Sequence, residues 1–255
     1  MEADKQAFFR DRLEVRVLAG PAAAGAAGAE IAAGIMRQEI ARAGGAAVVF
    51  ASAVSQDPFL AALGAQEIDW ARVTAFHMDE YAGMPGDHPA SFRRFLRERL
   101  FDHVPVAAFR QLDGEAEDLE AECRRYAGLL RLAQPCLAIM GIGENGHLAF
   151  IDPPVCDFGD PRDVRTVELD QVCRMQQVHD GAFARLEDVP RRALSLTVPF
   201  FLRVPRALVF VNGRHKSAAV RAALQGPIVE ACPASALRRH PSAILFLDPA
   251  AASLL

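Results

Sequence analysis

The sequence predicts an α/β protein in which one doubly wound, mostly parallel sheet has helices on both faces. Three observations predict this class. Short runs rich in Val, Ile, Leu and Phe alternate with longer helical stretches along all 255 residues, the runs are apolar almost without interruption, and Gly, Pro, Asp or Asn bounds each of them. Strands that are apolar on both sides are typical of a buried parallel sheet. No linker rich in Pro, Ser or Gly divides the chain, so we expect residues 1–255 to form a single domain.

Eight segments have the composition and the boundaries of strands. They are residues 13–18, 46–51, 72–78, 136–141, 164–169, 193–198, 207–211 and 243–247. Helical patterns lie between them, over residues 22–42, 58–63, 89–101, 115–132 and 216–224. The third pattern has an apolar stripe with a basic flank, made by Phe92, Phe95, Leu96 and Arg99. Residues 158–188 are polar, rich in charge and weakly periodic, and we expect a lid there.

The composition excludes several classes of protein. With 51% hydrophobic and 24% charged residues, the chain is neither disordered nor a small disulfide scaffold. The formal net charge is -4 and the Lys and Arg residues are scattered, which argues against nucleic acid as the main partner. The five cysteines form no C-x-x-C pair, so we expect free thiols in a reducing cytoplasm.

Two segments bear on targeting to a membrane. The N-terminal segment MEADKQAFFRDR is charged throughout and lacks the apolar run of a signal peptide. The stretch from Leu18 to Met36 is mostly Ala and Gly, is interrupted by Pro21 and Glu30, and is too weakly apolar to span a bilayer. We therefore expect a tightly packed helix there, and a cytoplasmic protein that does not enter a membrane.

Two adjacent carboxylates, Asp79 and Glu80, follow the third predicted strand. In doubly wound sheets, ligands bind beyond the carboxyl ends of the strands, so residues at such ends are candidates for function. Carboxylates at the end of a buried strand are costly unless they are solvated, hydrogen-bonded or used. Adjacent residues point in different directions, so we expect only one of the two to face a pocket. The alternative is that one of them caps a turn.

A glycine-rich loop follows the fourth predicted strand. Its Gly141, Gly143 and Gly146 match the spacing G-x-G-x-x-G of dinucleotide-binding sites. That fingerprint requires a helix that begins at the third glycine, whereas Pro153 and Pro154 arrive within about two turns of a helix. We therefore reject a dinucleotide site, and interpret the glycines as positions where the backbone turns sharply and approaches a ligand.

The same loop contains a histidine with a carboxylate and an amide nearby. Asp152 can fix the tautomer of His147 and raise its basicity, and Asn145 is close in sequence. These residues predict acid–base chemistry, and the alternative is a structural histidine. We expect no metal, because the chain has no H-E-x-x-H motif and no second histidine at ligand spacing.

Polar residues also follow the second and seventh predicted strands. Ser52, Ser55 and Gln56 precede Pro58, at a helix N-terminus whose N–H groups can hold an anion. Ordinary capping is the alternative there. Lys216 begins the helix after the seventh strand, at the same edge of the sheet, and Arg174 is a second candidate cation. For both cations the alternative is a solvated surface charge.

Three longer segments resemble the glucosamine-6-phosphate deaminase family, also called isomerases, which is related to the 6-phosphogluconolactonases. Residues 78–92 resemble the family's MDEY-x-G-x-P…HP-x-S-[YF] segment, residues 141–153 its G-x-G-x-[DN]-G-H-[IL]-[AG]-F-N-E-P loop, and residues 190–197 its VP-x-x-A-L-[ST]-[LV]-[TG] strand. Lactonases typically read D-E-R and G-E-D-G-H-[TA], so MDEY and HLAF favour the deaminase branch. The resemblance covers nearly the whole chain and implies a Rossmann-like fold of the sugar-phosphate isomerase type.

The resemblance implies that glucosamine 6-phosphate and water give fructose 6-phosphate and ammonium, through ring opening and proton transfer from C2 to C1. It makes Asp79 the base that moves this proton. It makes His147 the group that shuttles the ring-opening proton, with Asp152 and Asn145 beside it. It requires no metal or organic cofactor, and the expected partner is a phosphorylated amino sugar. The oligomeric state stays open, a homo-oligomer included.

The resemblance also implies a phosphate site at the turn 52–56, balanced by two cations. The substrate-binding residues that we expect from it are Ser52, Ser55, Gln56, Glu80, Gly143, Arg174 and Lys216. The turn lacks the glycines of the family's T-G-G-[ST] pattern, and Asp152 replaces a glutamate. Another substrate such as galactosamine 6-phosphate therefore stays open. Two other functions also stay open, a 6-phosphogluconolactonase in which His147 activates water, and a non-catalytic sugar-phosphate sensor.

Overall fold

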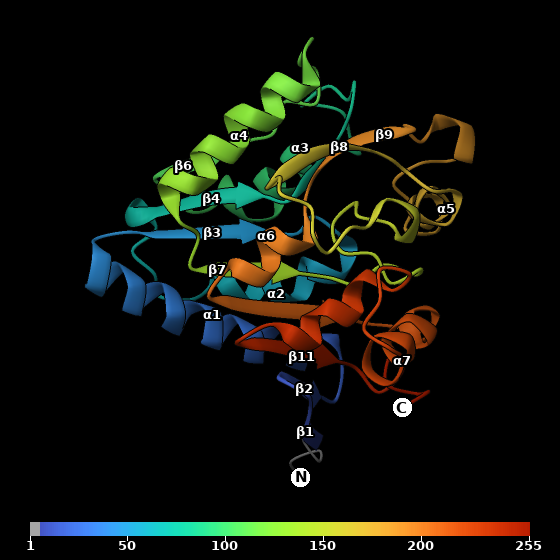
Figure 1. Ribbon diagram of the computed structural model, residues 1–255. Coiled ribbons are helices and arrows are strands. Elements are labelled where there is room, and N and C mark those ends of the chain that lie inside the picture. Colours follow the sequence, from blue (N-terminus) through green and yellow to red (C-terminus); the bar gives the residue numbers. More distant parts are fainter. Residues whose placement is uncertain (1–5) are drawn as a thin grey trace.

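The computed structural model describes residues 6–255, so the first five residues of the charged N-terminal segment lie outside the described range. An eight-stranded sheet lies at the centre, in the order β1-β2-β11-β10-β7-β3-β4-β6, and every neighbouring pair except β1 and β2 is parallel (Figure 1). Its strands are β1 (Gln6–Arg10), β2 (Leu13–Val17), β3 (Ala46–Phe50), β4 (Val73–His77), β6 (Ala108–Arg110), β7 (Leu137–Met140), β10 (Arg206–Val211) and β11 (Ala243–Leu247). The predicted class, an α/β fold with a mostly parallel sheet, is confirmed.

Helices and apolar side chains cover both faces of this sheet. The helices are α1 (Pro21–Ala43), α2 (Asp57–Gly64), α3 (Phe92–Leu96) with a π-helical turn at Arg97–Phe101, α4 (Leu119–Ala133), α5 (Gln171–His179), α6 (Val198–Arg203) and α7 (Ser217–Gln225). Successive residues of β3 point to opposite faces, so Val48 packs in the layer that contains α1 and α2, and Val49 in the layer that contains α4 and α7.

The Ala- and Gly-rich stretch from Leu18 to Met36 forms most of α1, a tightly packed helix as predicted. A side chain at Gly25 would place its Cβ 2.6 Å from the carbonyl carbon of Pro58, so only glycine lets α1 approach α2 this closely. Within residues 6–255, no helix is long and apolar enough to cross a membrane.

The expectation of a single sheet is wrong. β8 (Val164–Glu168) and β9 (Arg192–Leu196) lie where strands were predicted, but they pair antiparallel with each other and do not join the central sheet. β9 also pairs with β5 (Asp79–Tyr81), which completes a second sheet of three strands. Asp and Glu have low strand propensity, so the sequence around Asp79 favours a turn, and pairing with β9 overrides that preference.

The order of the strands reverses between β3 and β7. From β3 the chain continues to β4 on one side, whereas from β7 it continues to β10 on the other. The carboxyl ends of β3 and β7 therefore flank a switch point, where doubly wound sheets bind ligands. In Figure 1 the helices α5 and α7 lie at this end of the sheet. The helix α5 is part of residues 158–188, for which motion as a lid stays a prediction.

Candidate active site

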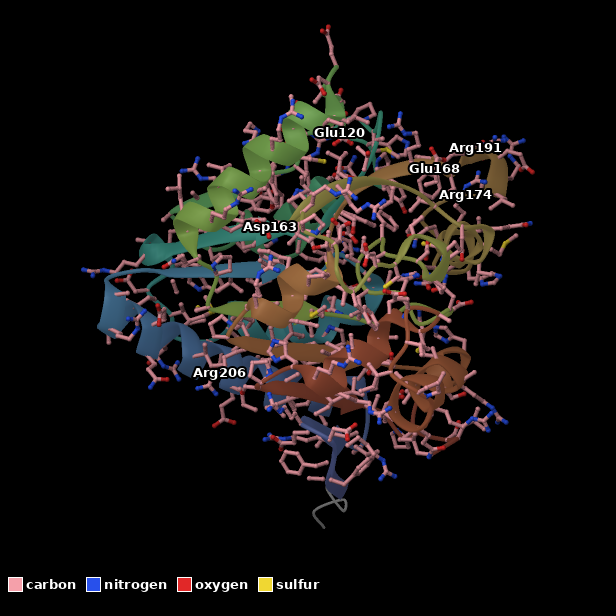
Figure 2. All side chains as sticks on the ribbon, in the orientation of Figure 1. Glu120, Asp163, Glu168, Arg174, Arg191 and Arg206 are labelled. Carbon is pink, nitrogen blue, oxygen red and sulfur yellow. The ribbon has the colours of Figure 1, made fainter. Side chains whose placement is uncertain are left out.

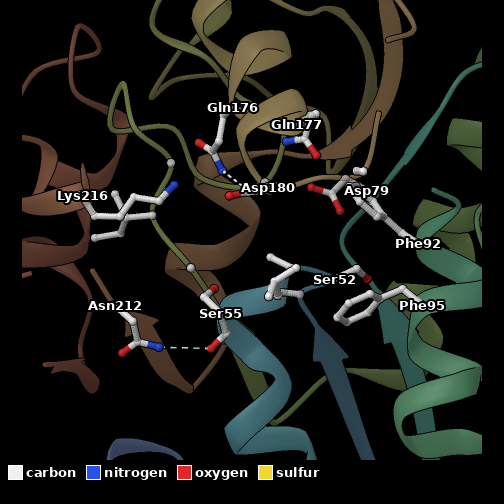
Figure 3. A pocket seen from close by; sticks show the side chains of 18 of the residues that line it. Ser52, Ser55, Asp79, Phe92, Phe95, Gln176, Gln177, Asp180, Asn212 and Lys216 are labelled. Carbon is white, nitrogen blue, oxygen red and sulfur yellow. Dashed lines mark hydrogen bonds between the residues drawn. The ribbon is translucent and has the colours of Figure 1, made fainter. Parts of the chain in front are cut away.

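A cavity of about 670 Å³ lies at the switch point (Figure 3). Its wall is made of residues that follow β3, β4, β7, β10 and β11, together with the C-terminal end of α5. The cavity brings together six of the residues expected to form the site, Ser52, Ser55, Asp79, Gly143, His147 and Lys216. The five that do not line it are Gln56, Glu80, Asn145, Asp152 and Arg174.

Asp79 lies at the start of β5 and points its carboxylate into the cavity (Figure 3). The residue is 6% exposed, and within the described residues no donor is hydrogen-bonded to its carboxylate. Burial, and secondly the negative charge of Glu80, raise the pKa of Asp79 well above its ordinary value. A carboxylate in this state is a stronger base than a solvated one, so it is suited to accept a proton from carbon.

His147 is held by a network beneath the cavity. Its Nδ1 lies 3.0 Å from Oδ1 of Asp152, although the ring nitrogen is poorly aligned with that oxygen for a hydrogen bond. Asn145 donates from Nδ2 to the same oxygen at 3.0 Å and accepts the backbone N–H of His147 at 3.0 Å. A Cβ on Gly143 would lie 2.2 Å from the imidazole ring, so this glycine makes room for the histidine. Asp152 and Asn145 therefore act on the cavity through His147.

Asp152 is fully buried and charged. Burial alone would raise its pKa, but hydrogen bonds and the attraction of His147 outweigh burial, so the pKa lies below its ordinary value. Its second oxygen accepts the backbone N–H of Asp170 at 3.1 Å. Asp152 is one methylene shorter than the family's glutamate, and its two oxygens still reach His147, Asn145 and Asp170.

A group with metal-ligand atoms exists in this network. His147, Asp152 and Cys173 each place one ligand atom within 4.8 Å of the others. Burial raises the pKa of the Cys173 thiol well above its ordinary value, and metals bind the thiolate. Both oxygens of Asp152 already accept hydrogen bonds. The group is therefore better suited to hydrogen bonding than to holding a metal.

The opposite side of the cavity, around the turn after β3, has unsatisfied polar groups. The hydroxyl of Ser52 and the amide oxygen of Asn212 are buried without a hydrogen-bond partner among the described residues. Asn212 donates from Nδ2 to the carbonyl of Ser55 at 3.3 Å, which ties the turn to the loop after β10. Gln56 is fully buried behind the turn and donates to the carbonyl of Met140 at 3.4 Å, so it supports the turn and does not face a ligand.

Lys216 supplies a cation on this side (Figure 3). The residue is 7% exposed, and within residues 6–255 no carboxylate forms an ion pair with it. Burial lowers the pKa of Lys216 below its ordinary value, and the more distant charges of Asp180 and Glu144 only partly oppose this effect. A buried ammonium without a paired anion is costly, so its place beside the turn favours an anionic ligand.

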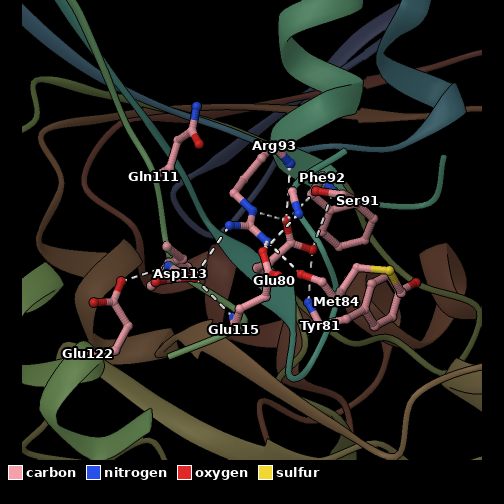
Figure 4. Close-up of polar contacts among 12 residues, drawn as sticks. Glu80, Tyr81, Met84, Ser91, Phe92, Arg93, Gln111, Asp113, Glu115 and Glu122 are labelled. Atoms are coloured by element: carbon pink, nitrogen blue, oxygen red, sulfur yellow. Dashed lines mark hydrogen bonds and ion pairs between the residues drawn. The ribbon is translucent and has the colours of Figure 1, made fainter. Parts of the chain in front are cut away.

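Glu80 does not touch the cavity, which corrects its expected place among the substrate-binding residues. Its carboxylate accepts hydrogen bonds from the hydroxyl of Ser91, from Nε of Arg93 at 3.1 Å, and from the backbone N–H groups of Tyr81, Phe92 and Arg93 (Figure 4). It thus caps the N-terminus of α3 and pairs with a buried arginine. Burial raises the pKa of Glu80, and these donors oppose that rise.

Arg174 does not line the cavity, and its role as a phosphate ligand stays a prediction. Its guanidinium donates to the carbonyls of Leu186 at 2.7 Å and Val189 at 2.8 Å. Figure 2 shows it on the outer side of the molecule, near Arg191, which immediately precedes β9. Gln176 and Gln177 of α5 line the cavity, whereas Arg174 does not, because its guanidinium is held by these two carbonyls.

Arg99 is a cation at the cavity that the sequence did not assign to the site. Its Nε lies 3.0 Å from Oδ1 of Asp57, the first residue of α2, and its guanidinium lies 4.6 Å from the centre of the Phe95 ring. It belongs to the π-helical turn after α3, a feature frequently found at functional sites. The basic flank of the predicted helix was the available signal.

The end of α5 contributes three further residues that the sequence analysis missed, Gln176, Gln177 and Asp180 (Figure 3). Gln176 accepts the backbone N–H of Glu144 at 2.9 Å and donates to Asp180 at 3.2 Å. Gln177 accepts the hydroxyl of Tyr81 at 2.8 Å. The helix α5 was not predicted because its apolar periodicity is weak. Only the polar character of residues 158–188 indicated that this segment lies near a ligand.

The cavity thus brings Asp79, His147 and Lys216 together at one edge of the α/β sheet. The chain belongs to the family of glucosamine-6-phosphate isomerases and 6-phosphogluconolactonases, whose model matches residues 20–245. It is 38% identical over 188 residues to the glucosamine-6-phosphate deaminases of Bacillus thuringiensis (strain Al Hakam) and Bacillus anthracis (strain A0248), a match that covers 74% of this chain and 70% of each relative.

Solved structures show the same relationship. A monomeric glucosamine-6-phosphate deaminase superposes with a TM-score of 0.86 at 29% identity, over 94% of this chain and 99% of that one. A 6-phosphogluconolactonase from Shewanella baltica superposes with a TM-score of 0.77 at 19% identity, over 92% of this chain and 97% of that one. The lactonase likeness, at this low identity, concerns the fold alone.

Proposed function

We propose that this chain is an amino-sugar-phosphate deaminase that converts glucosamine 6-phosphate and water to fructose 6-phosphate and ammonium. The observation that carries the proposal is that Asp79, His147 and Lys216 line one cavity, and that the Asp79 carboxylate and the Lys216 ammonium have no partner within residues 6–255. The identity to proteins named as deaminases supports it, and so does the MDEY sequence at residues 78–81.

The first step is the opening of the sugar ring. His147 moves a proton between the anomeric hydroxyl and the ring oxygen, which breaks the bond from C1 to the ring oxygen and leaves an aldehyde. Asp152 stays ionised beneath the imidazole, with Oδ1 3.0 Å from Nδ1 of His147. The aldehyde then makes the hydrogen on C2 acidic enough for a carboxylate to remove.

The second step is the transfer of the C2 proton by Asp79. Removal of this proton gives an enolamine, and return of the proton to C1 gives an imine at C2. Water adds to the imine carbon, and the C–N bond then breaks to release ammonia and leave the C2 ketone of fructose 6-phosphate. Proton transfers by a positioned side chain contribute about 10²–10⁴-fold in rate.

The phosphate is held on the other side of the cavity. Ser52 and Ser55 offer hydroxyl groups, and Lys216 offers a buried positive charge. We assign the second cation to Arg99 because Arg174 is held elsewhere. Its contact with Asp57 neutralises the carboxylate that would otherwise repel a phosphate at this turn. Binding energy from the phosphate positions C1 and C2 at the base.

Ammonium release and lactone hydrolysis, measured side by side, test the proposal. The purified protein is given glucosamine 6-phosphate, galactosamine 6-phosphate and 6-phosphogluconolactone. We expect ammonium from glucosamine 6-phosphate and almost none after the substitution Asp79→Asn. Lactone hydrolysis without ammonium release would instead establish a lactonase. Thermal stabilisation by the sugar phosphates without any turnover would establish a sensor.

We further propose that one cytoplasmic domain carries this activity. The family match spans residues 20–245, and the wall of the cavity draws on residues from Pro21 to Asp248. All five cysteines are free thiols, which suits a reducing compartment. Every residue assigned above belongs to this chain.

A further inference from the structure

Two adjacent glutamines of α5 line the cavity, and the protein uses their amide groups differently. The oxygen of Gln176 accepts the N–H of Glu144, and its nitrogen donates to Asp180, so both ends of this amide are occupied. The oxygen of Gln177 accepts the hydroxyl of Tyr81, whereas its nitrogen donates to no group within residues 6–255. Of these two glutamines, Gln177 is therefore the one whose NH₂ group has no acceptor within residues 6–255, whereas that of Gln176 uses one of its two hydrogens.

The hydroxyl of Tyr81 fixes which way this amide points. Tyr81 is fully buried, and its ring packs against Phe92, Phe150 and Phe183 with centroids 5.0, 5.1 and 5.5 Å away, so the ring cannot move aside. A buried hydroxyl must donate its hydrogen, and the amide oxygen of Gln177 is its acceptor. Burial raises the pKa of Tyr81 well above its ordinary value, so the hydrogen stays on the hydroxyl. The NH₂ group of Gln177 consequently points away from Tyr81.

Gln177 and Asp79 line the same cavity, and Figure 3 shows them near each other, with the nitrogen of the Gln177 amide on the side of Gln176. Asp79 and Tyr81 are two residues apart on β5, so their side chains lie on the same face of that strand, and Gln177 is bonded to the Tyr81 hydroxyl. A donor beside the base that attacks C2 meets an oxygen on a carbon next to C2. The oxygen on C1 belongs to the ring-opening chemistry of His147, so the hydroxyl on C3 is the remaining acceptor.

We propose that Gln177 is a specificity-determining residue, whose NH₂ group donates a hydrogen bond to the C3 hydroxyl of the sugar phosphate, and that Tyr81 is its positioning residue. This inference rests on the proposed deaminase function. The proposed contact gives a role to the Gln177 amide, whose oxygen is hydrogen-bonded to Tyr81 and whose nitrogen is available to a ligand. A hydroxyl lost opposite a buried donor leaves that donor unpaired, which costs about 1–3 kcal/mol, or about 10–100-fold in kcat/KM.

The test compares glucosamine 6-phosphate with its 3-deoxy analogue, by kcat/KM for ammonium release. We expect the wild type to disfavour the analogue at least about tenfold. Gln177→Met keeps the length of the side chain but has no donor, so its two values should agree within about twofold, with most of the loss in KM. The matched control is Gln176→Met, which removes the occupied amide and should keep the wild-type ratio.

A second variant reports on the positioning residue. Tyr81→Phe keeps the buried ring and the amide of Gln177 but frees the amide to rotate, so its ratio should lie between those of the wild type and Gln177→Met. An undiminished ratio in Gln177→Met, with glucosamine 6-phosphate still turned over, would overturn the role of Gln177 alone. A wild type that releases no ammonium would overturn the deaminase function, and this inference with it.

Discussion

Asp79 and Glu80 are adjacent carboxylic acids and are almost equally buried, yet their carboxylates have opposite surroundings. The carboxylate of Glu80 accepts hydrogen bonds from side chains and backbone at the start of α3 and pairs with Arg93. The carboxylate of Asp79 has no such partner among residues 6–255 and points into the cavity. The alternation of β5 places them on opposite sides of one short strand.

This difference indicates that Glu80 stabilises the structure around the site, whereas Asp79 acts in the reaction. Glu80 fixes α3, and through it the π-helical turn that carries Arg99. Asp79 is buried without compensation, which destabilises the fold but preserves a reactive base. Functional sites commonly carry such a cost in stability. The two residues therefore offer matched substitutions, one of which should remove activity and the other stability.

The largest effect is expected from Asp79→Asn. The amide cannot take up the C2 proton, so kcat should fall by about 10²–10⁴-fold. The same change should stabilise the protein at neutral pH, because it removes the cost of ionising a buried carboxyl. Ammonium release and thermal unfolding, measured on the same sample, check both parts.

The pH dependence of that stabilisation follows from the raised pKa of Asp79. The neutral carboxyl of the wild type contributes its full stability below the ordinary pKa of an aspartate, and this contribution is lost as the pH rises through the folded-state pKa. The difference in melting temperature between Asp79→Asn and the wild type should therefore widen as the pH rises. A variant that is less stable than the wild type at every pH would contradict an unpaired Asp79.

Glu80→Gln should act mainly on stability. Removing one partner of a buried ion pair leaves Arg93 poorly compensated, and we expect the free energy of unfolding to fall by about 3 kcal/mol. The folded variant should retain turnover, with its acidic limb moved to lower pH because the charge of Glu80 helps to raise the pKa of Asp79. Urea unfolding and a pH–rate profile measure the two effects. A loss of kcat as large as that of Asp79→Asn would contradict the claim that Glu80 stabilises the site and Asp79 acts in catalysis.

Lys216→Met should raise KM for the sugar phosphate by about 10–100-fold, since a hydrogen bond to a charged group is worth about 1.5–3 kcal/mol. Because the pKa of Lys216 is lowered by burial, the wild type should also lose affinity at a lower pH than an ordinary lysine would allow. Lys216→Arg is the control, since its charge persists to higher pH. Equal KM values in Lys216→Met and wild type would show that the phosphate does not bind on the Lys216 side of the cavity.

The smallest effect distinguishes two arginines. Arg99→Ala should raise KM by about tenfold, since it removes a half-exposed cation that also neutralises Asp57. Arg174→Ala should leave KM within about twofold, because its guanidinium is bonded to backbone carbonyls outside the cavity. The reverse ranking would mean that Arg174 reaches the phosphate in the substrate complex, as the family resemblance suggested.

Most of the central sheet could be predicted from the sequence because buried parallel strands have a strong local signal. The eight predicted strands all form, within one residue or two of their expected limits. β5 could not be predicted, since three residues with two acids form a strand only by pairing with the distant β9. The same long-range pairing explains why β8 and β9 form a second sheet, a property that local patterns do not contain.

The site shows the same division. Asp79, His147 and Lys216 were predictable because each follows a strand at the ligand edge of the sheet. The place of Arg174 was not, because its weakly periodic helix gave no indication of which face meets the cavity. Gln177 was not predicted for a related reason. Its proposed role depends on a hydrogen bond to Tyr81 that forms only in the folded chain.

The fate of the hydrogen on C2 tests the role of Asp79 most directly. Glucosamine 6-phosphate that carries deuterium at C2 is incubated with wild type and with Asp79→Asn, and the label at C1 and C2 is followed by NMR. In the wild type, we expect deuterium to leave C2, to appear in part at C1 of fructose 6-phosphate, and to be accompanied by ammonium. Asp79→Asn should keep its deuterium at C2. Loss of that deuterium from Asp79→Asn at the wild-type rate would show that another group removes the proton.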